Sequence, residues 1–434
     1  MIYFSWISII RIGLVQMALG SILALTNATL NRIMVVELSL LAIVPGMLIA
    51  LHYAIQITRP NWGLLSDIGG NRTRWIIGGL SILGIGATLA TVGIIVFEKN
   101  FSLGLFISSI AYGLIGIGVG ASGTSLLALL ATGTQEKQRA LAATITWLMM
   151  IMGAILTAFI VGDLLEPYSH LRLLIIVINL SIIVTIVSAI SLWGIEKKAF
   201  TLSPPSTSTK SLYRRAILEI LAEPLTRLFT IFVFVAMTAY YMQDLILEPY
   251  AGLIFDFSVK ESTKLSGYQN SGALVGMIIT GLLASIFRVG TLRFWVAFGC
   301  FSSAIALALI SSLSTFKFGV SLKYAVIFLG FSNGIFAVAA IGSMMQLAGN
   351  GKRKREGTRM GIWGASQAIA AGFGGLLGTG LLDIIRSLEV TTETAFSSVF
   401  LVEALLFMIA AIISLRIRKK KIEETSFTTL KMVE

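Results

Sequence analysis

Polar side chains able to do chemistry are few in this sequence, and most of them fall inside long apolar segments. His52, Gln56 and Arg59 follow one another at spacings of four and three residues. On a helix, these positions lie within about 60° of each other. Charged groups at membrane depth are costly, which makes them functional candidates. The spacing therefore predicts a polar stripe that faces other helices rather than lipid.

Further polar candidates occupy four other apolar segments. In one of these segments, Tyr240, Asp244 and Glu248 follow one another at spacings of four residues and so share one helix face. The full set of candidate ligand-binding residues is Asn27, Asn31, Arg32, His52, Gln56, Arg59, Tyr240, Asp244, Glu248, Gln367 and Glu403. The two arginines have a structural alternative, in which they pair with Glu37, Asp244 or Glu403 and hold helices together. The sequence leaves both interpretations open.

His52 is the histidine that lies within an apolar segment, since His170 falls in an expected loop. A neutral imidazole is a good metal ligand, so His52 is a candidate axial ligand for the magnesium of a chlorin. The alternative is an ordinary buried hydrogen bond. Two histidines and one cysteine, Cys300, provide no zinc cluster and no internal disulfide, so we expect no metal site in the protein itself.

A candidate gating loop follows the second apolar segment. It consists of Gly63, Asp67, Gly70, Arg72 and Arg74. The acidic residue can approach a helix N-terminus and pair with the arginines, while the glycines allow a sharp turn. This pattern favours a conformational latch over a substrate site.

The composition identifies the elements that must position these residues. Of 434 residues, 56% are hydrophobic and 12% are charged, against about 25% charged in soluble proteins. A soluble fold with so little charge could not cover its surface. We therefore expect an all-α polytopic membrane protein with twelve transmembrane helices. They are expected at about 12–36, 41–65, 75–97, 102–131, 140–162, 171–194, 225–248, 265–287, 292–313, 320–348, 358–385 and 394–416.

The distribution of lysine and arginine predicts the orientation. With both termini in the cytoplasm, 24 of the 33 basic residues fall on the inside and 7 on the outside, while Arg32 and Arg59 lie within helices. This bias satisfies the positive-inside rule. The net charge of +12 therefore reflects membrane topology, and we expect membrane lipids as partners and no nucleic acid.

A polar segment rich in serine, threonine and proline divides the twelve helices equally. We expect an N-terminal six-helix half at 1–195, a cytoplasmic linker at 196–224, a C-terminal six-helix half at 225–417 and a basic cytoplasmic tail at 418–434. The halves resemble each other, because Arg359 follows Arg139 at an equivalent position in the second half. Two parallel repeats of this kind describe the major facilitator architecture.

Four segments together resemble the bacteriochlorophyll delivery family of PucC and LhaA proteins, a branch of the major facilitator superfamily. They are Thr29–Leu38, Leu247–Gly252, Ser266–Met277 and Glu356–Gly372. The stretches 51–60 and 67–79 depart from PucC and LhaA themselves and look like a third subgroup. The similarity covers nearly the whole chain.

The resemblance implies an assembly factor without catalytic activity. Its cargo would be bacteriochlorophyll or a precursor, with no tightly bound cofactor. Its partners would be light-harvesting or reaction-centre polypeptides and pigment-synthesis enzymes such as bacteriochlorophyll synthase. Its location would be the photosynthetic, intracytoplasmic part of the bacterial inner membrane.

Flat and flexible side chains suit such a cargo. Trp147, Tyr240, Tyr241, Trp363, Met149, Met150 and Met152 could contact a macrocycle, although each could equally serve ordinary helix packing. The alternative function is a proton-coupled secondary transporter of a small solute, with Asp244, Glu248 or Glu403 as the proton carrier.

Overall fold

The computed structural model describes residues 3–68, 71–135, 138–196, 223–285, 287, 289–316, 321–349 and 356–417. Every regular element within these residues is a helix, and ten are long and apolar enough to cross a membrane. This confirms the expected all-α membrane class. Most of the predicted linker, the basic tail, the basic loop 352–355, Gly70, the surroundings of Gly63 and the side chain of Asp67 lie outside the described part of the chain.

The first helix group begins with a continuous rod in which two short π-helical segments interrupt the α-helix. The rod consists of α1 (Trp6–Ala24), η1 (Leu25–Thr29), α2 (Leu30–Arg32) and η2 (Ile33–Glu37). It is followed by α3 (Ile43–Ile55), η3 (Gln56–Thr58), α4 (Arg59–Ile68), α5 (Arg72–Phe97), α6 (Phe101–Gly133), α7 (Arg139–Leu164) and α8 (His170–Leu192). We call this set the N-terminal group.

The second helix group, which we call the C-terminal group, follows the undescribed segment 197–222. It consists of α10 (Pro224–Phe255), α11 (Val259–Ser285), α12 (Leu292–Phe316), α13 (Leu322–Gly349), α14 (Glu356–Arg386) and α15 (Thr392–Arg416). Helix α11 and the α3–α4 segment are the two long helical stretches outside the ten apolar spans.

Local sequence explains where several helices begin and end. Helix α1 starts six residues before the expected span because the Ser5 hydroxyl accepts a hydrogen bond from the Ser8 amide and caps the helix. Helix α10 was expected to end near residue 248, but it continues through Pro249 to Phe255. It ends where Asp256 adopts a left-handed conformation with φ 56°.

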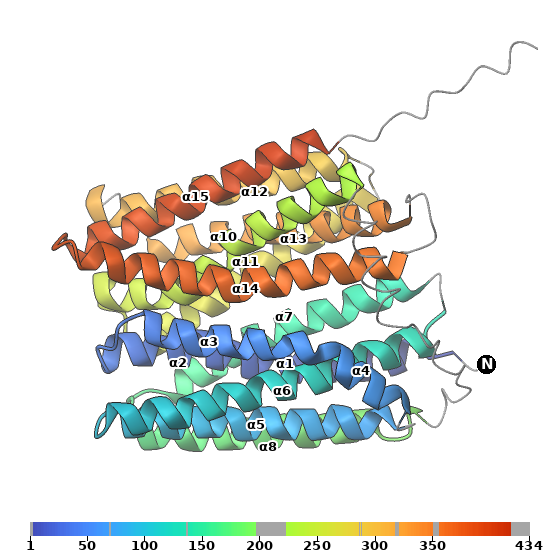
Figure 1. Ribbon diagram of the computed structural model, residues 1–434, viewed down its shortest axis with the longest axis horizontal. Coiled ribbons are helices and arrows are strands. Elements are labelled where there is room, and N and C mark those ends of the chain that lie inside the picture. The colour runs from blue at the N-terminus through green and yellow to red at the C-terminus, as the bar shows by residue number, and fades with distance from the viewer. Residues whose placement is uncertain are drawn as a thin grey trace, which may run out of the picture.

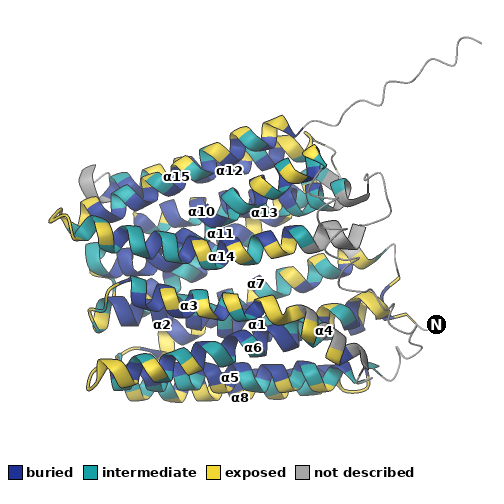
Figure 2. Ribbon diagram, viewed as in Figure 1, coloured by how far each residue is buried: buried dark blue, intermediate teal, exposed yellow. Residues whose placement is uncertain are grey.

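Each helix group has its own hydrophobic core, and the two cores lie side by side. One core is formed mainly by residues 229–417 and the other mainly by residues 4–195. Figure 1 shows the helices of both groups running along the long axis, with the α1–α8 group below the α10–α15 group. In Figure 2, dark blue buried residues face the helix neighbours and yellow exposed residues face outward.

The direction of the chain defines two ends of this bundle. We call the end where α1 begins the first end, and the end where η2 finishes at Glu37 the second end. The rod, the α3–α4 segment and each later helix within a group run in alternating directions between these two ends (Figure 1).

Candidate functional site

A cavity of about 240 Å³ lies between the two helix groups. Four of the predicted ligand-binding residues line it, namely Asn27, Tyr240, Asp244 and Gln367. They come from η1, α10 and α14, which are far apart in the sequence. The structure therefore brings part of the predicted set together in one place.

Aromatic side chains form one wall of this cavity. The rings of Tyr53 and Tyr241, which belong to different helix groups, lie 5.6 Å apart edge to face. Tyr240 and Tyr241 lie 5.2 Å apart in the same manner. Trp147 and Met150 also line the cavity, as we expected for a flat ligand. Such offset aromatic faces are suited to contacting another π-system.

Other predicted ring contacts do not reach the cavity. Trp363 is fully buried in the C-terminal group and packs against Phe229, with ring centroids 4.8 Å apart. Met149 packs against Gly13 in the N-terminal group. Both serve helix packing, which was the alternative interpretation.

Several polar residues in the cavity were not among the predicted candidates. Ser266, Gln269 and Asn270 of α11 and Asn333 of α13 line it, together with Tyr53. A signal existed in the sequence, because Ser266, Gln269 and Asn270 fall within five residues of a helix that is long enough to span a membrane. These groups can donate to ring carbonyls or other acceptors of a ligand.

The predicted residues of the first rod lie where its helical geometry is irregular. Asn27 falls within η1, while Asn31 and Arg32 belong to the short α2 between η1 and η2. Single π-helical turns inside α-helices often occur at functional sites. Here the irregularity coincides with the part of the rod that contacts the C-terminal group.

Asn31 and Arg32 fasten the two helix groups together rather than line the cavity. The Asn31 side-chain amide donates to the main-chain oxygen of Leu245 at 2.7 Å. The Arg32 guanidinium donates to the main-chain oxygen of Phe257 at 2.8 Å and pairs with Glu37. The pairing with Glu37 is the structural alternative that the sequence had left open.

Further polar contacts close the second end of the bundle. Lys264 pairs with Asp163 at 2.6 Å, and Lys260 pairs with Glu166 at 2.6 Å, so α11 is tied to α7 and the residues after it. The Asp383 carboxylate of α14 accepts the amide N–H groups of Ala42 and Ile43 at the start of α3. The cavity is therefore closed from the second end by three sets of contacts between the groups.

The predicted polar stripe forms a chain of hydrogen bonds inside the N-terminal group. The Gln56 amide bonds to His52 Nε2 at 2.7 Å, and Arg59 donates to the Gln56 oxygen. His52 and Gln56 are buried, whereas Arg59 is exposed. None of the three lines the cavity, and a Cβ on Gly116 of α6 would lie 2.7 Å from the His52 oxygen. The structure does not bring His52 to a position facing the cavity.

The remaining two predicted carboxyl groups are buried away from the cavity. Glu248 accepts a hydrogen bond from the Ser266 hydroxyl. Glu403 is fully buried in α15, and neither of its oxygens has a hydrogen-bond partner among the residues that the structure describes. Asp244 is thus the predicted carboxyl group that faces the cavity.

The candidate gating loop is described in part. Arg72 donates to the oxygens of Ala128 and Thr132 of α6, and Arg74 is exposed. The N-terminus of α5 is capped by Glu196, whose carboxylate accepts the amides of Arg72 at 2.5 Å and Thr73 at 3.0 Å. Glu196 was not among the candidates, although a carboxylate at a helix N-terminus is favourable.

The contact between α7 and α11 beside the cavity is apolar. Ile151, Ile155 and Met277 form a small buried cluster there. Ile151 and Met277 also line the cavity, so this cluster separates the cavity from the side of the bundle. Trp147 at the same place is 39% exposed. The cavity therefore borders the lipid-facing surface through side chains that a hydrocarbon phase would tolerate.

Solved structures of transporters share this fold. A bacterial homologue of the human drug peptide transporters superposes with a TM-score of 0.70 at 16% identity, covering 95% of this chain and 97% of that one. The nucleoside transporter NupG superposes with a TM-score of 0.68 at 13% identity over 95% of this chain and 100% of that one. At these identities the likeness establishes the fold alone, and it is the major facilitator type of fold that the sequence predicted.

Curated relatives are more similar in sequence. The chain is 53% identical to the protein named "Bacteriochlorophyll synthase 44.5 kDa chain" of Rhodobacter capsulatus, over 94% of this chain and 95% of that protein. It is 27% identical to Protein PucC of Cereibacter sphaeroides, over 88% and 84% of the two chains. The difference between these identities confirms a subgroup distinct from PucC itself. A model of the family described as PUCC protein matches residues 29–422, and the chain therefore belongs to the PucC family.

Proposed function

We propose that this protein is a non-enzymatic assembly factor that binds bacteriochlorophyll or a precursor within the membrane and delivers it to photosynthetic complexes. Membership of the PucC family supports a role in the assembly of such complexes. The observation that favours a pigment is the cavity between the helix groups, which combines tyrosine and tryptophan rings with amide side chains.

The proposed mode of binding follows from the chemistry of the cavity lining. The rings of Tyr53, Tyr240 and Tyr241 would contact the flat macrocycle. The side-chain amides of Gln269 and Asn270 would donate hydrogen bonds to its carbonyl groups. A polar side chain from the cavity or a water molecule would serve as the axial ligand of the magnesium, because His52 does not line the cavity.

The size of the cavity requires that it widens for this cargo. Pockets for drug-sized ligands have volumes of roughly 300–1,000 Å³, and the cavity measures about 240 Å³. We propose that the apolar contact between α7 and α11 separates to admit the macrocycle from the lipid side. Separating Ile151, Ile155 and Met277 breaks no polar contact of their side chains, and lipid tails would solvate the exposed faces.

The proposal includes an arrangement in the membrane. We propose that α11 and the α3–α4 segment also cross the bilayer, which gives twelve spans with both termini in the cytoplasm. The small number of lysine and arginine residues at the second end agrees with this orientation. The first end would then face the cytoplasm, where pigment-synthesis enzymes such as bacteriochlorophyll synthase could supply the cargo. Light-harvesting or reaction-centre polypeptides would receive it in the photosynthetic inner membrane.

Purification from a host that makes bacteriochlorophyll tests the proposal. The protein is extracted in mild detergent with its native lipids, and the bound pigment is measured by far-red absorbance and mass spectrometry. We expect pigment in a fixed ratio to protein, and reduced antenna or reaction-centre assembly with normal pigment synthesis when the gene is deleted. A colourless protein and unchanged assembly in the deletion strain would contradict the proposal.

A second candidate function is supported by one residue and by the fold. Asp244 faces the cavity, and the structural neighbours are peptide and nucleoside transporters. A proton-coupled transporter of a small solute would use such a carboxyl group as its proton carrier. Uptake driven by a pH gradient into vesicles that contain the purified, colourless protein would favour this function over pigment delivery.

A further inference from the structure

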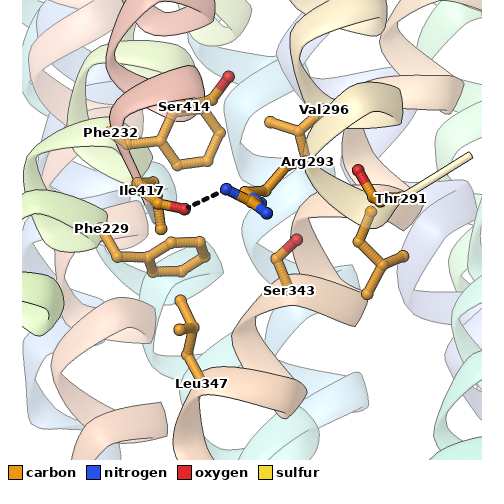
Figure 3. Close-up of a pocket in the computed structure, with 10 residues that line it drawn as sticks. Phe229, Phe232, Thr291, Arg293, Val296, Ser343, Leu347, Ser414 and Ile417 are labelled. Atoms are coloured by element: carbon orange, nitrogen blue, oxygen red, sulfur yellow. Dashed lines mark hydrogen bonds between the residues drawn. The ribbon is translucent and has the colours of Figure 1, made fainter. Parts of the chain in front are cut away.

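A second cavity lies inside the C-terminal group at the first end of the bundle. It measures about 330 Å³ and is bordered by α10, α12, α13 and α15. It shares no lining residue with the cavity between the groups. Figure 3 shows its lining, with the Arg293 side chain reaching between the Phe229 and Phe232 rings on one side and Ser343 on the other.

One part of this cavity is suited to an anion. The Arg293 guanidinium donates one long hydrogen bond of 3.3 Å, to the oxygen of Ile417, out of the five N–H groups it possesses. Within the part of the chain that the structure describes, no carboxylate pairs with Arg293. The Thr291 hydroxyl caps α12 at this place by accepting the Phe294 amide. The first amide groups of a helix have no partner within it and attract anions.

A buried hydroxyl gives an independent indication of a ligand. Ser343 is 9% exposed, and its Oγ has no hydrogen-bond partner among the described residues. Figure 3 shows this oxygen directed toward Arg293. A buried polar group without a partner is costly, and a bound acceptor would satisfy it.

The rest of the cavity is apolar. Phe229, Phe232, Val296 and Leu347 supply apolar side chains to its lining. Phe229 and Phe232 are almost fully buried from solvent by the surrounding helices. A ligand that fills the cavity must therefore combine an anionic head with a hydrocarbon portion.

We propose that this cavity is a binding site for an anionic phospholipid of the surrounding membrane. The phosphate would lie between Arg293, the N-terminus of α12 and the Ser343 hydroxyl, with the beginning of an acyl chain against the phenylalanines. The site lies near the ends of four helices. In a bundle that spans the bilayer, the helix ends lie at the depth of the lipid head groups. An arginine that has no carboxylate partner among the described residues favours a head group with net negative charge. A zwitterionic head group is less favourable, because its own cation would be repelled by the guanidinium.

Native mass spectrometry of the full chain in detergent tests the site. The protein is titrated with phosphatidylglycerol or phosphatidylcholine, and the fraction with bound lipid is measured. We expect phosphatidylglycerol to bind more tightly. Arg293→Gln should weaken its binding about tenfold and Ser343→Ala about threefold, as expected for lost charged and neutral hydrogen bonds. The matched control is Arg227→Gln, which removes an exposed arginine of the same end that lies outside the cavity.

Three outcomes would overturn the proposal. The first is equal binding of the two lipids, and the second is equal loss of binding in the Arg293→Gln and Arg227→Gln variants. The third is displacement of phosphatidylglycerol by millimolar inorganic phosphate, which would assign the site to a free anion. The Arg293→Lys variant keeps the positive charge but lacks the planar guanidinium, so it should bind phosphatidylglycerol more tightly than Arg293→Gln does. It also controls for effects of the substitution on folding.

Discussion

The Asn31 side-chain amide donates a 2.7 Å hydrogen bond to the main-chain oxygen of Leu245, the residue next to Asp244. Both groups are buried, and they belong to different helix groups. This contact ties the irregular part of the first rod to the helix that carries the cavity tyrosines. The closed second end of the bundle and the shape of the cavity therefore depend on each other.

Replacing Asn31 by Leu should loosen this contact while keeping the side-chain volume. Side-chain hydrogen bonds between membrane helices contribute about 0.6 kcal/mol on average and up to about 1.7 kcal/mol. We expect a small fall in thermal stability, measured by the unfolding midpoint in detergent, and increased reactivity of a cysteine introduced at Leu247 in the cavity lining. Unchanged reactivity would mean that Asn31 does not hold the second end closed.

A disulfide that locks the second end closed should distinguish pigment delivery from transport across the membrane. A Cβ added to Gly162 would lie 3.1 Å from Lys264 Cγ, so the pair Gly162→Cys and Lys264→Cys is within disulfide reach. The buried Cys300 is first replaced by Ala. The disulfide joins α7 and α11 at the second end, whereas the proposed entry lies at Ile151, Ile155 and Met277, at least seven residues from Gly162 along α7. We therefore expect the oxidised protein to keep binding and transferring pigment. Loss of transfer that is reversed by reduction, and absent in the Gly162→Cys single variant, would indicate that the second end must open.

Asp244→Asn should distinguish the two candidate functions. The amide keeps an oxygen acceptor in the cavity but cannot carry a proton at this position. Pigment retention should change less than about threefold, which corresponds to one neutral hydrogen bond. A proton-coupled transporter would lose gradient-driven uptake instead. The two readouts are pigment per protein after purification and uptake into vesicles.

Trp147→Leu should weaken pigment binding. An aromatic contact contributes about 0.5–1.5 kcal/mol beyond the area it buries, which predicts that binding weakens roughly twofold to twelvefold. Trp193→Leu is the matched control, because Trp193 is 82% exposed and lies outside the cavity. Equal pigment retention in the two variants would remove Trp147 from the proposed site.

His52→Leu should lower stability without lowering pigment retention. The change removes the partner of the Gln56 amide in a buried position, which costs about 1–3 kcal/mol. We expect a lower unfolding midpoint and the same ratio of pigment to folded protein. The opposite pattern, less pigment at an unchanged midpoint, would support His52 as a ligand of the magnesium after all.

Much of the fold follows from the sequence because of the bilayer itself. A helix must satisfy its backbone hydrogen bonds internally and span about 30 Å of hydrocarbon, so apolar length alone identifies most of the helices. The low charge and the repeated halves lead to the same architecture that the transporters show. Helix ends were less predictable, because single side chains such as Ser5 and Asp256 decide them.

The site was predictable only in part. Spacing along one helix shows which polar residues share a face, and the His52–Gln56–Arg59 stripe is such a face. Spacing does not show which neighbour that face meets. Asn27, Asp244 and Gln367 line one cavity because three separate helices converge, whereas Asn31 and Arg32 act as ties between the groups. Helix packing is a long-range property, since it depends on which small residues allow close approach, and only the tertiary structure decided it.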